Sequence, residues 1–175
     1  MNFFKSLLLL LFTFTFNFAT FSQTSKDSVF LIKYVDEMAD KTYYFTNRKL
    51  VVSNDEKTVG FGVEPFINDN LTFGFLSVKI INLGTCNDND EIIILFENGE
   101  KIIKKSWKDF NCEGVAYFDM EYEDLYLLKS QQISKIRITN GYTYQSFTGN
   151  VKQKDKRYFI QFLYSLNNGL FIEQK

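Results

Sequence analysis

The sequence predicts a mainly β protein, an antiparallel β-sandwich-like domain with one short helix and a C-terminal helix. Aromatic residues make up 18% of the chain, and proline occurs once, at Pro65. Aromatic and β-branched residues favour strands, and Asn, Asp and Gly separate the apolar runs at the spacing of an antiparallel protein. This many strands is more than one open sheet holds comfortably, so we expect two packed sheets or a barrel. The predicted strands are 29–35, 42–46, 50–53, 58–63, 71–82, 91–97, 101–106, 114–120, 133–139 and 142–147.

Two Asn-Gly pairs predict tight β-hairpins. Asn98-Gly99 and Asn140-Gly141 each lie between apolar runs, and both residue types tolerate the positive φ angles of a type I′ turn. Along residues 133–139, isoleucines alternate with polar residues, which indicates a strand with one buried and one solvated face. The continuous apolar run 92–96 favours a central strand that is covered on both faces.

Two segments have the features of helices. Residues 121–129 place acidic side chains in the first turn and Lys129 in the last, which suits both ends of the helix dipole. The second predicted helix spans 156–168, with Asp155 as a candidate N-cap and Gly169 just after its end. The side chains expected to face the sheets are Tyr122, Leu125 and Leu128 in the first helix, and Tyr158, Phe159, Phe162, Leu163 and Leu166 in the second.

Residues 1–22 have the pattern of a cleaved signal peptide, followed by a single β-rich domain at residues 23–175. Lys5 supplies the positive charge, an uncharged Leu/Phe core follows, and the small residue Ser22 suits a cut before Gln23. The alternative is a membrane anchor, but an apolar core of about ten residues is shorter than the roughly 20 that a spanning helix needs. We therefore expect a periplasmic or secreted protein with no transmembrane anchor after cleavage.

Composition excludes several classes of function. The chain has 20 basic and 21 acidic residues, a balance that argues against nucleic acid or a strongly charged polymer as partner. It has no histidine, so Ser-His-Asp catalysis and the usual zinc sites are excluded, and it has no glycine-rich phosphate-binding motif. We predict no cofactor and no enzyme activity, although paired carboxylates could still support glycoside hydrolysis.

Cys86 and Cys112 are the only two cysteines. Export would bring both to an oxidising compartment, so a disulfide between them is the simplest interpretation. The chain-entropy model gives such a bond roughly 3.5 kcal/mol of stabilisation for a loop of about 27 residues. Two buried thiols are the alternative. For Trp107 we favour packing near this pair over the alternative of ligand binding.

The acidic segment 87–91 is the most suggestive local feature for metal binding. Asp88, Asp90 and Glu91 supply closely spaced oxygen ligands, as at the start of a calcium-binding loop. The segment lacks the glycine and the distal glutamate of an EF-hand, because an apolar strand follows at once. A solvated turn that leads into this strand is therefore the simpler interpretation.

Four tyrosines are candidate binding aromatics: Tyr43, Tyr44, Tyr142 and Tyr144. Exposed aromatic side chains stack on sugars or pack against a partner surface. Tyr43 and Tyr44 would point to opposite faces of a strand, so at least one of them is expected in the core.

The segments 34–45 and 50–53, together with the surroundings of both cysteines, resemble small exported bacterial β-rich proteins of unassigned function. The similar elements also include the hairpin that begins at Phe96 and the sequence Asn-Cys-Glu-Gly at 111–114. The resemblance implies a secreted or periplasmic domain and carries over no catalytic or binding residue.

These observations favour an exported, non-catalytic binding or structural module of the bacterial envelope. Its expected partner is an envelope protein or a polysaccharide. A carrier of small apolar ligands or lipids is the first alternative, and it requires an apolar cavity. A secreted carboxylate-based hydrolase is the second, and it requires two acids that face one groove.

Overall fold

A computed structural model of the protein describes residues 31–38, 40–84, 86–108 and 110–173. The predicted signal segment lies outside these ranges. A short 3-10 helix, Gln153–Asp155, precedes the second α-helix. The other elements are β1 (Leu31–Asp36), β2 (Lys41–Phe45), β3 (Leu50–Ser53), β4 (Gly60–Asn68), β5 (Phe73–Ile81), β6 (Glu91–Phe96), β7 (Lys101–Lys105), β8 (Val115–Glu121), α1 (Tyr122–Ser130), β9 (Ile133–Thr139), β10 (Ser146–Asn150), α2 (Tyr158–Asn167) and β11 (Phe171–Glu173).

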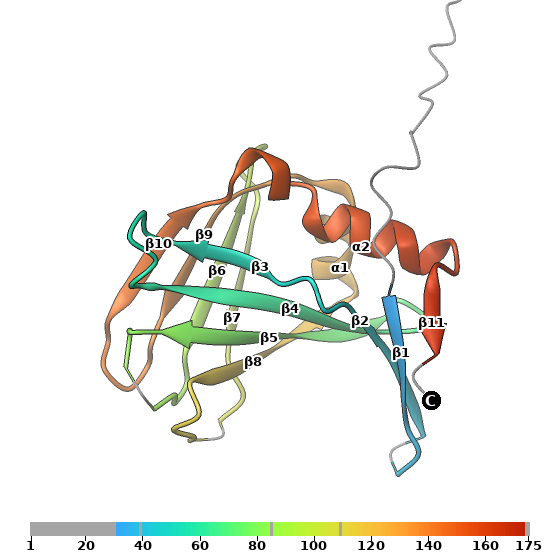
Figure 1. The fold of residues 1–175 in the computed structure, drawn as a ribbon, viewed down its shortest axis with the longest axis horizontal. Coiled ribbons are helices and arrows are strands. Elements are labelled where there is room, and N and C mark those ends of the chain that lie inside the picture. The colour runs from blue at the N-terminus through green and yellow to red at the C-terminus, as the bar shows by residue number, and fades with distance from the viewer. Residues whose placement is uncertain (1–30, 39, 85, 109, 174–175) are drawn as a thin grey trace, which may run out of the picture.

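The strands form two sheets, and the predicted mainly β fold is confirmed (Figure 1). The large sheet has seven strands in the order β11-β1-β2-β4-β5-β8, with β3 also paired to β4. The small sheet has four strands in the order β10-β9-β6-β7. The pairings are antiparallel except between β1 and β11, which run parallel. Helices α1 and α2 pack together, and α2 ends beside β11 (Figure 1).

Alternation along the long strands β4 and β5 decides which side chains enter the core. Val63 pairs with Val78 and both are fully buried, whereas Phe66 pairs with Phe75 and both stay partly exposed. Successive strand residues point to opposite faces, so the large sheet has an apolar inner face and a second, outward set of side chains. The largest fully buried side chains come from both sheets and from α2: Phe61, Leu76, Ile92, Ile94, Phe96, Phe118, Tyr158, Phe159 and Phe162.

The C-terminal helix packs as its sequence predicts, but it begins later. All five predicted core residues of α2 are buried. The helix starts at Tyr158, and Asp155 does not cap it; the Asp155 carboxylate instead accepts a 2.8 Å hydrogen bond from the Arg48 guanidinium. Gly169 follows the helix with φ of 66°, a left-handed conformation that glycine adopts without strain. The predicted end of the helix is therefore confirmed, and the predicted N-cap is wrong.

Tyr158 also contacts the segment between β2 and β3. These two strands pair with opposite ends of β4. Its hydroxyl donates a hydrogen bond to the backbone carbonyl of Arg48, whose guanidinium lies 5.8 Å from the ring centre. Burial raises the pKa of the Tyr158 phenol, so the group remains a neutral donor across the physiological range. This hydrogen bond connects α2 to the large sheet at the segment between β2 and β3.

Helix α1 is anchored at its first turn. Glu121 and Asp124 form a capping box, in which the Asp124 carboxylate accepts a 2.8 Å hydrogen bond from the Glu121 backbone amide. Lys104 of β7 reaches the same carboxylate at 2.6 Å. Leu125 and Leu128 are buried as predicted, but Tyr122 is 61% exposed and is not part of the core. Neither helix in the described part of the chain is long and apolar enough to cross a membrane.

Both Asn-Gly pairs lie in β-hairpins, but neither forms the predicted type I′ turn. In the β6–β7 hairpin, Gly99 alone takes a positive φ, of 89°. In the β9–β10 hairpin neither residue does, and a longer loop, 140–145, closes through a 2.8 Å hydrogen bond from the Asn140 amide to the Gln145 carbonyl. Strand β10 therefore begins at Ser146 and not at residue 142. Gly141 is required for another reason, since a Cβ there would collide with the Asp88 carbonyl.

The predicted disulfide joins two of the crossovers between the sheets, those that connect β5 to β6 and β7 to β8. Residues 82–90 lead from β5 to β6 and residues 106–114 lead from β7 to β8; Cys86 and Cys112 connect them with an S–S distance of 2.02 Å. The Asn87 amide donates to the Asn111 carbonyl at 2.7 Å, and the reverse hydrogen bond is 3.2 Å. This end of the sandwich is thus fixed by a covalent bond and by paired backbone hydrogen bonds.

Removal of the disulfide is expected to reduce stability strongly. The bond closes a sequence separation of 26 residues, so the Cys86→Ser/Cys112→Ser variant should lose about 3.5 kcal/mol of unfolding free energy. Urea denaturation of the two proteins measures the difference. Alkylation of the native protein without reduction, followed by mass spectrometry, should find both cysteines protected; labelling of both would contradict the bond.

Candidate functional site

Six aromatic side chains form a continuous surface on the outward side of the large sheet, here called the aromatic face. They come from neighbouring strands β2, β4, β5 and β8 and from the loop that follows β7. Each of the six side chains is at least partly exposed and therefore in contact with solvent. The aromatic face consists of Tyr43, Phe45, Phe66, Phe75, Trp107 and Tyr117.

Strand register brings these rings together. Phe66 lies opposite Phe75 in the β4–β5 ladder, and their centroids are 4.9 Å apart with planes only 5° from parallel. Phe45 stacks on Phe66 at 5.1 Å and 23°. Because cross-strand neighbours have Cβ atoms about 5 Å apart, outward rings on adjacent strands must touch. The three phenylalanines form a stack that runs across the strands.

The remaining three rings are turned relative to this stack. Tyr43 lies 5.7 Å from Phe75 at 68°, and Tyr117 lies 6.0 Å from Phe75 at 71°. Trp107 meets Phe75 at 5.5 Å and 52°, and it stacks on Tyr117 at 5.1 Å. Phe75 is therefore the centre of the face, with Tyr43 on one side and the Trp107–Tyr117 pair on the other.

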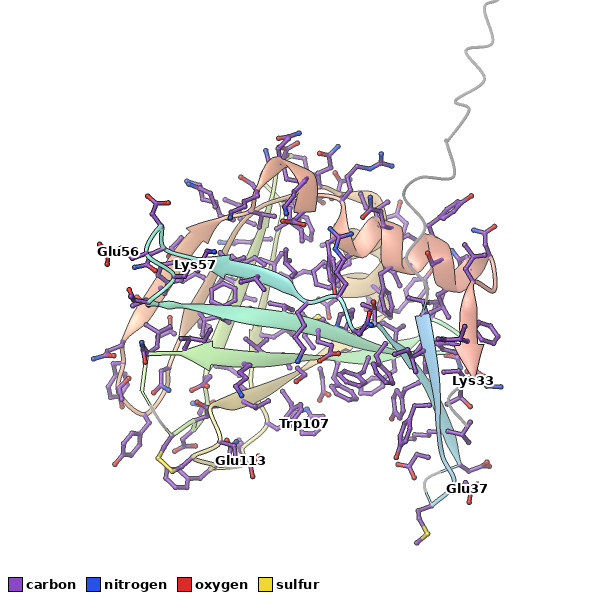
Figure 2. The ribbon with its side chains drawn as sticks, in the orientation of Figure 1. Lys33, Glu37, Glu56, Lys57, Trp107 and Glu113 are labelled. Carbon is purple, nitrogen blue, oxygen red and sulfur yellow. A yellow bond between two sulfur atoms is a disulfide. The ribbon has the colours of Figure 1, made fainter. Side chains whose placement is uncertain are left out.

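Trp107 is the most exposed of the six residues, at 38%, and it is held at both ends. Its backbone amide donates to the Tyr117 carbonyl at 2.9 Å, and its indole N–H donates to the Asp119 carboxylate at 2.8 Å. Figure 2 shows Trp107 below β5, on the side of the sheet away from α2. As expected, it lies near the disulfide region, because it lines a small hollow with Asn87 and Asn111.

Polar groups accompany the rings on the same side of the sheet. Glu64 alternates with Phe66 on β4 and forms a 3.0 Å ion pair with Lys49. Ser77 lies opposite both Glu64 and Tyr117 in the strand ladders. The outward surface therefore combines aromatic rings with carboxylate, hydroxyl and ammonium groups, so it carries both charge signs, and Glu64 is paired with Lys49.

The four predicted binding tyrosines lie in three different places. Tyr43 belongs to the aromatic face, whereas Tyr44 is 7% exposed and packs in the core against Phe171 at 5.1 Å. Tyr142 and Tyr144 are 59% and 84% exposed, but they lie in the loop 140–145 and not in a strand. Tyr142 contacts Phe110 edge to face at 5.9 Å. The structure therefore does not unite the four tyrosines in one patch.

Asp90, one of the predicted calcium ligands, is fully buried among other polar residues. Its Oδ1 accepts a 2.7 Å hydrogen bond from the Gly141 amide, and its backbone amide donates to the Ser106 hydroxyl at 2.8 Å. Among the described residues, its Oδ2 has no hydrogen-bond partner. Burial raises the pKa of the Asp90 carboxyl, because desolvation disfavours the charged form more than the nearby amides favour it.

The structure does not bring the predicted calcium ligands together. Asp90 points inward to the 140–145 loop, while Glu91 forms ion pairs with Lys105 at 3.5 Å and Arg137 at 3.7 Å. Within the described ranges, no three His, Cys, Asp or Glu side chains are placed to hold a metal ion. Residues 87–91 instead belong to the β5–β6 crossover, which hydrogen bonds to the loop 140–145. The Asn140 side chain donates to the Cys86 carbonyl at 2.9 Å.

The buried Asp90 carboxyl should make the protein less stable as the pH rises. In the folded state the group keeps its proton to a higher pH than in the unfolded chain, where the ordinary value is near 3.8. The folded state then binds more protons in this window, so unfolding free energy falls as pH increases through it and stays lower above it. Asp90→Asn retains an acceptor for the Gly141 amide and cannot ionise. Its unfolding free energy should therefore rise relative to that of the wild type as the pH increases through this window.

Urea titrations of both proteins between pH 4 and pH 8 test this difference. Asp90→Ala serves as the comparison, because it leaves the partly buried Gly141 amide without this acceptor and should cost about 1–3 kcal/mol. Parallel curves for the wild type and Asp90→Asn would show that Asp90 does not titrate in a shifted environment.

Sequence reasoning did not identify Phe45, Phe66, Phe75 and Tyr117 as members of a site. Phe45, Phe75 and Tyr117 occupy outward positions of predicted strands, whereas Phe66 lies beyond residue 63, where the predicted strand ended and β4 continues. The signal was the presence of apolar rings at positions where alternation expects polar residues. Strand order was the missing information, because only the β2-β4-β5-β8 order makes these four residues neighbours. Comparisons of the chain with protein-family models, curated proteins and solved structures found no match.

Proposed function

We propose that this chain is an exported, non-catalytic binding module of the bacterial envelope, and that it holds an uncharged polysaccharide on the aromatic face. The observation that carries the proposal is the set of six contiguous rings on the outward side of the large sheet, all in contact with solvent. Isolated exposed apolar residues are common on protein surfaces, but contiguous apolar patches mark interaction sites.

A sugar chain fits both the shape and the chemistry of this surface. Pyranose rings have apolar C–H faces that pack on aromatic rings, and hydroxyls around their edges that bond to polar side chains. The face offers the rings of Trp107, Tyr117 and Tyr43, with the groups of Glu64 and Ser77 on the same side. The strands make this surface broad and continuous, which suits an extended polymer.

Charge balance favours an uncharged polymer. Glu64 is paired with Lys49, and the Asp119 carboxylate accepts the indole N–H of Trp107. A polyanion or polycation would require an excess of the opposite charge on the face, as electrostatic complementarity normally provides. The chain as a whole is also nearly balanced, with 20 basic and 21 acidic residues.

The alternatives named from the sequence find less support. A lipid carrier needs an apolar cavity, but the space between the sheets is filled by fully buried side chains such as Phe61, Phe118 and Ile94. A carboxylate hydrolase needs a desolvated acid that faces a groove. The buried acid Asp90 is turned toward the Gly141 amide.

Trp107 makes polysaccharide binding directly measurable, because it is the only tryptophan in the chain. Titration with soluble neutral polysaccharides, such as β-glucan, xyloglucan, galactomannan and xylan, should change the intensity or wavelength of its fluorescence. Tyr117→Ala should weaken binding to the responsive polymer by about tenfold, since loss of one stacking ring removes about 0.5–1.5 kcal/mol beyond its area of contact. Affinity electrophoresis gives an independent measurement for this variant and for Trp107→Ala.

Tyr144→Ala is the matched control, because Tyr144 is 84% exposed but lies in the loop 140–145. It should bind the responsive polymer as the wild type does. Loss of binding in Tyr144→Ala with retention in Tyr117→Ala would move the site to the loops. No response to any neutral polymer, together with capture of an envelope protein through Trp107, would replace the polysaccharide with a protein partner.

Export can be tested separately. We propose a cut after Ser22, so mature protein recovered from the periplasm or medium should begin at Gln23. Intact-mass spectrometry and N-terminal sequencing of the protein produced in a bacterial host check this expectation. Protein that stays in the cytoplasm at full length would contradict it.

A further inference from the structure

We infer that the protein has a second binding site, separate from the aromatic face, for a small monocarboxylate with a compact apolar body. The site is a hollow of about 240 Å³ between α1, α2 and the turn that joins β4 to β5. It shares no lining residue with the aromatic face. Its ligand class follows from an apolar floor, a cationic rim and its small size.

The floor is made of leucines from three elements. Leu125 comes from α1 and Leu163 from α2, and they are 3% and 2% exposed. Leu71 comes from the β4–β5 turn and packs against the same core while remaining partly exposed. Burial of an apolar group on this floor removes apolar surface of both the ligand and the protein from water, which is favourable.

Leu71 adopts a backbone conformation that is unfavourable for leucine. Its φ is 56°, in the left-handed region, which glycine and asparagine enter far more readily than leucine does. The turn that imposes this conformation is held by Asn68, whose side-chain oxygen accepts hydrogen bonds from the Thr72 and Phe73 amides, both 3.2 Å long. The packing of Leu71 against the core accounts for an apolar residue at this position, and the same packing places its side chain in the floor of the hollow.

The rim carries three hydrogen-bond donors on one side of α1. Tyr122, Tyr126 and Lys129 are spaced at i, i+4 and i+7, so they lie along one helical face above the floor. Among the described residues, neither the two phenol hydroxyls nor the Lys129 ammonium has a hydrogen-bond or ion-pair partner. Lys129 resembles Lys79 and Lys135, which are also exposed and without an ion pair among the described residues, whereas Lys49, Lys104 and Lys156 pair with carboxylates. Lys129 differs from Lys79 and Lys135 in lining this hollow.

A carboxylate is the group that satisfies this rim. It accepts hydrogen bonds only, and its two oxygens can take up one ammonium and two hydroxyl donors. The lining contains one cation and no acidic side chain, so the charge is not neutralised from within. Asn70, the remaining polar lining residue, already uses its side-chain oxygen to accept from the Thr72 amide at 3.1 Å.

The size of the hollow limits the ligand. Pockets for drug-sized molecules measure about 300–1,000 Å³, so this one suits an acid with a single ring or a short branched chain. The acid end lies at the exposed rim, where Tyr122 and Tyr126 are 61% and 62% exposed. The apolar end contacts the leucines below.

Nuclear magnetic resonance of the isotope-labelled protein tests this site with two simple acids in place of the natural ligand. The probes are phenylacetate and 4-methylpentanoate, and the controls are the corresponding neutral amides, which have the same apolar bodies. Each acid should shift the amide resonances of Leu71, Leu125 and Leu163, and should bind about tenfold more tightly than its amide. Trp107, on the other side of the sheet, should not respond, which separates this result from polysaccharide binding.

Lys129→Met keeps the length of the side chain and removes its charge, so it should abolish the tenfold preference for the acid while the amide binds as before. Lys129→Arg should restore the preference. Lys135→Met, which removes an exposed lysine from β9, is the matched control and should change neither affinity. Equal binding of acid and amide, shifts centred elsewhere, or an unchanged preference in Lys129→Met would each overturn the proposal.

Discussion

The bond between Cys86 and Cys112 joins two of the crossovers through which the chain passes between its sheets, and it fixes one end of the sandwich. Apolar packing between the sheets has no directional preference, so the bond adds a directional constraint at this end, as the Lys104–Asp124 ion pair does near α1. The paired backbone hydrogen bonds of Asn87 and Asn111 continue the clamp, and Asn140 adds the β9–β10 loop to it. The second crossover also carries Trp107, so the clamp helps to hold its indole ring against Phe75.

The aromatic face arises because the strands carry aromatic residues at outward positions in addition to the apolar residues at inward positions. On β4 and β5, the inward positions are filled by residues such as Val63 and Val78, yet the outward positions also carry Phe66 and Phe75. The stacked rings stabilise the sheet, at about 0.5–1.5 kcal/mol for each pair beyond burial. Stability alone does not require them to remain in contact with solvent, and a surface of this kind carries a solubility cost unless a partner uses it.

Much of the fold follows from local rules, and its departures from prediction have long-range causes. Period-two alternation and apolar runs located most of the strands, and the stripe of α2 identified its buried side correctly. Asp155 does not cap α2, because it ends the preceding 3-10 helix two residues before the N-cap position; its carboxylate is bound by Arg48, far away in the sequence. The candidate sites were predictable only in part for the same reason. Tyr43 was identified as a binding aromatic, but its five neighbours on the aromatic face became visible only with the strand order. Lys129 was explained by the helix dipole, and its place beside a hollow required the β4–β5 turn and α2 to meet α1 in space.

The two proposed sites differ in what they must order on binding. The rings of the aromatic face are already stacked, and Trp107 is fixed by hydrogen bonds from its backbone and its indole. Little side-chain freedom is lost when a polymer settles on such a surface, so weak contacts repeated along a chain can give useful affinity. The rim of the hollow is different, because Lys129 and the two tyrosines are exposed and free to move. A ligand there must order these side chains, which is why the fixed leucine floor has to supply much of the affinity and the ammonium chiefly the selectivity for an acid.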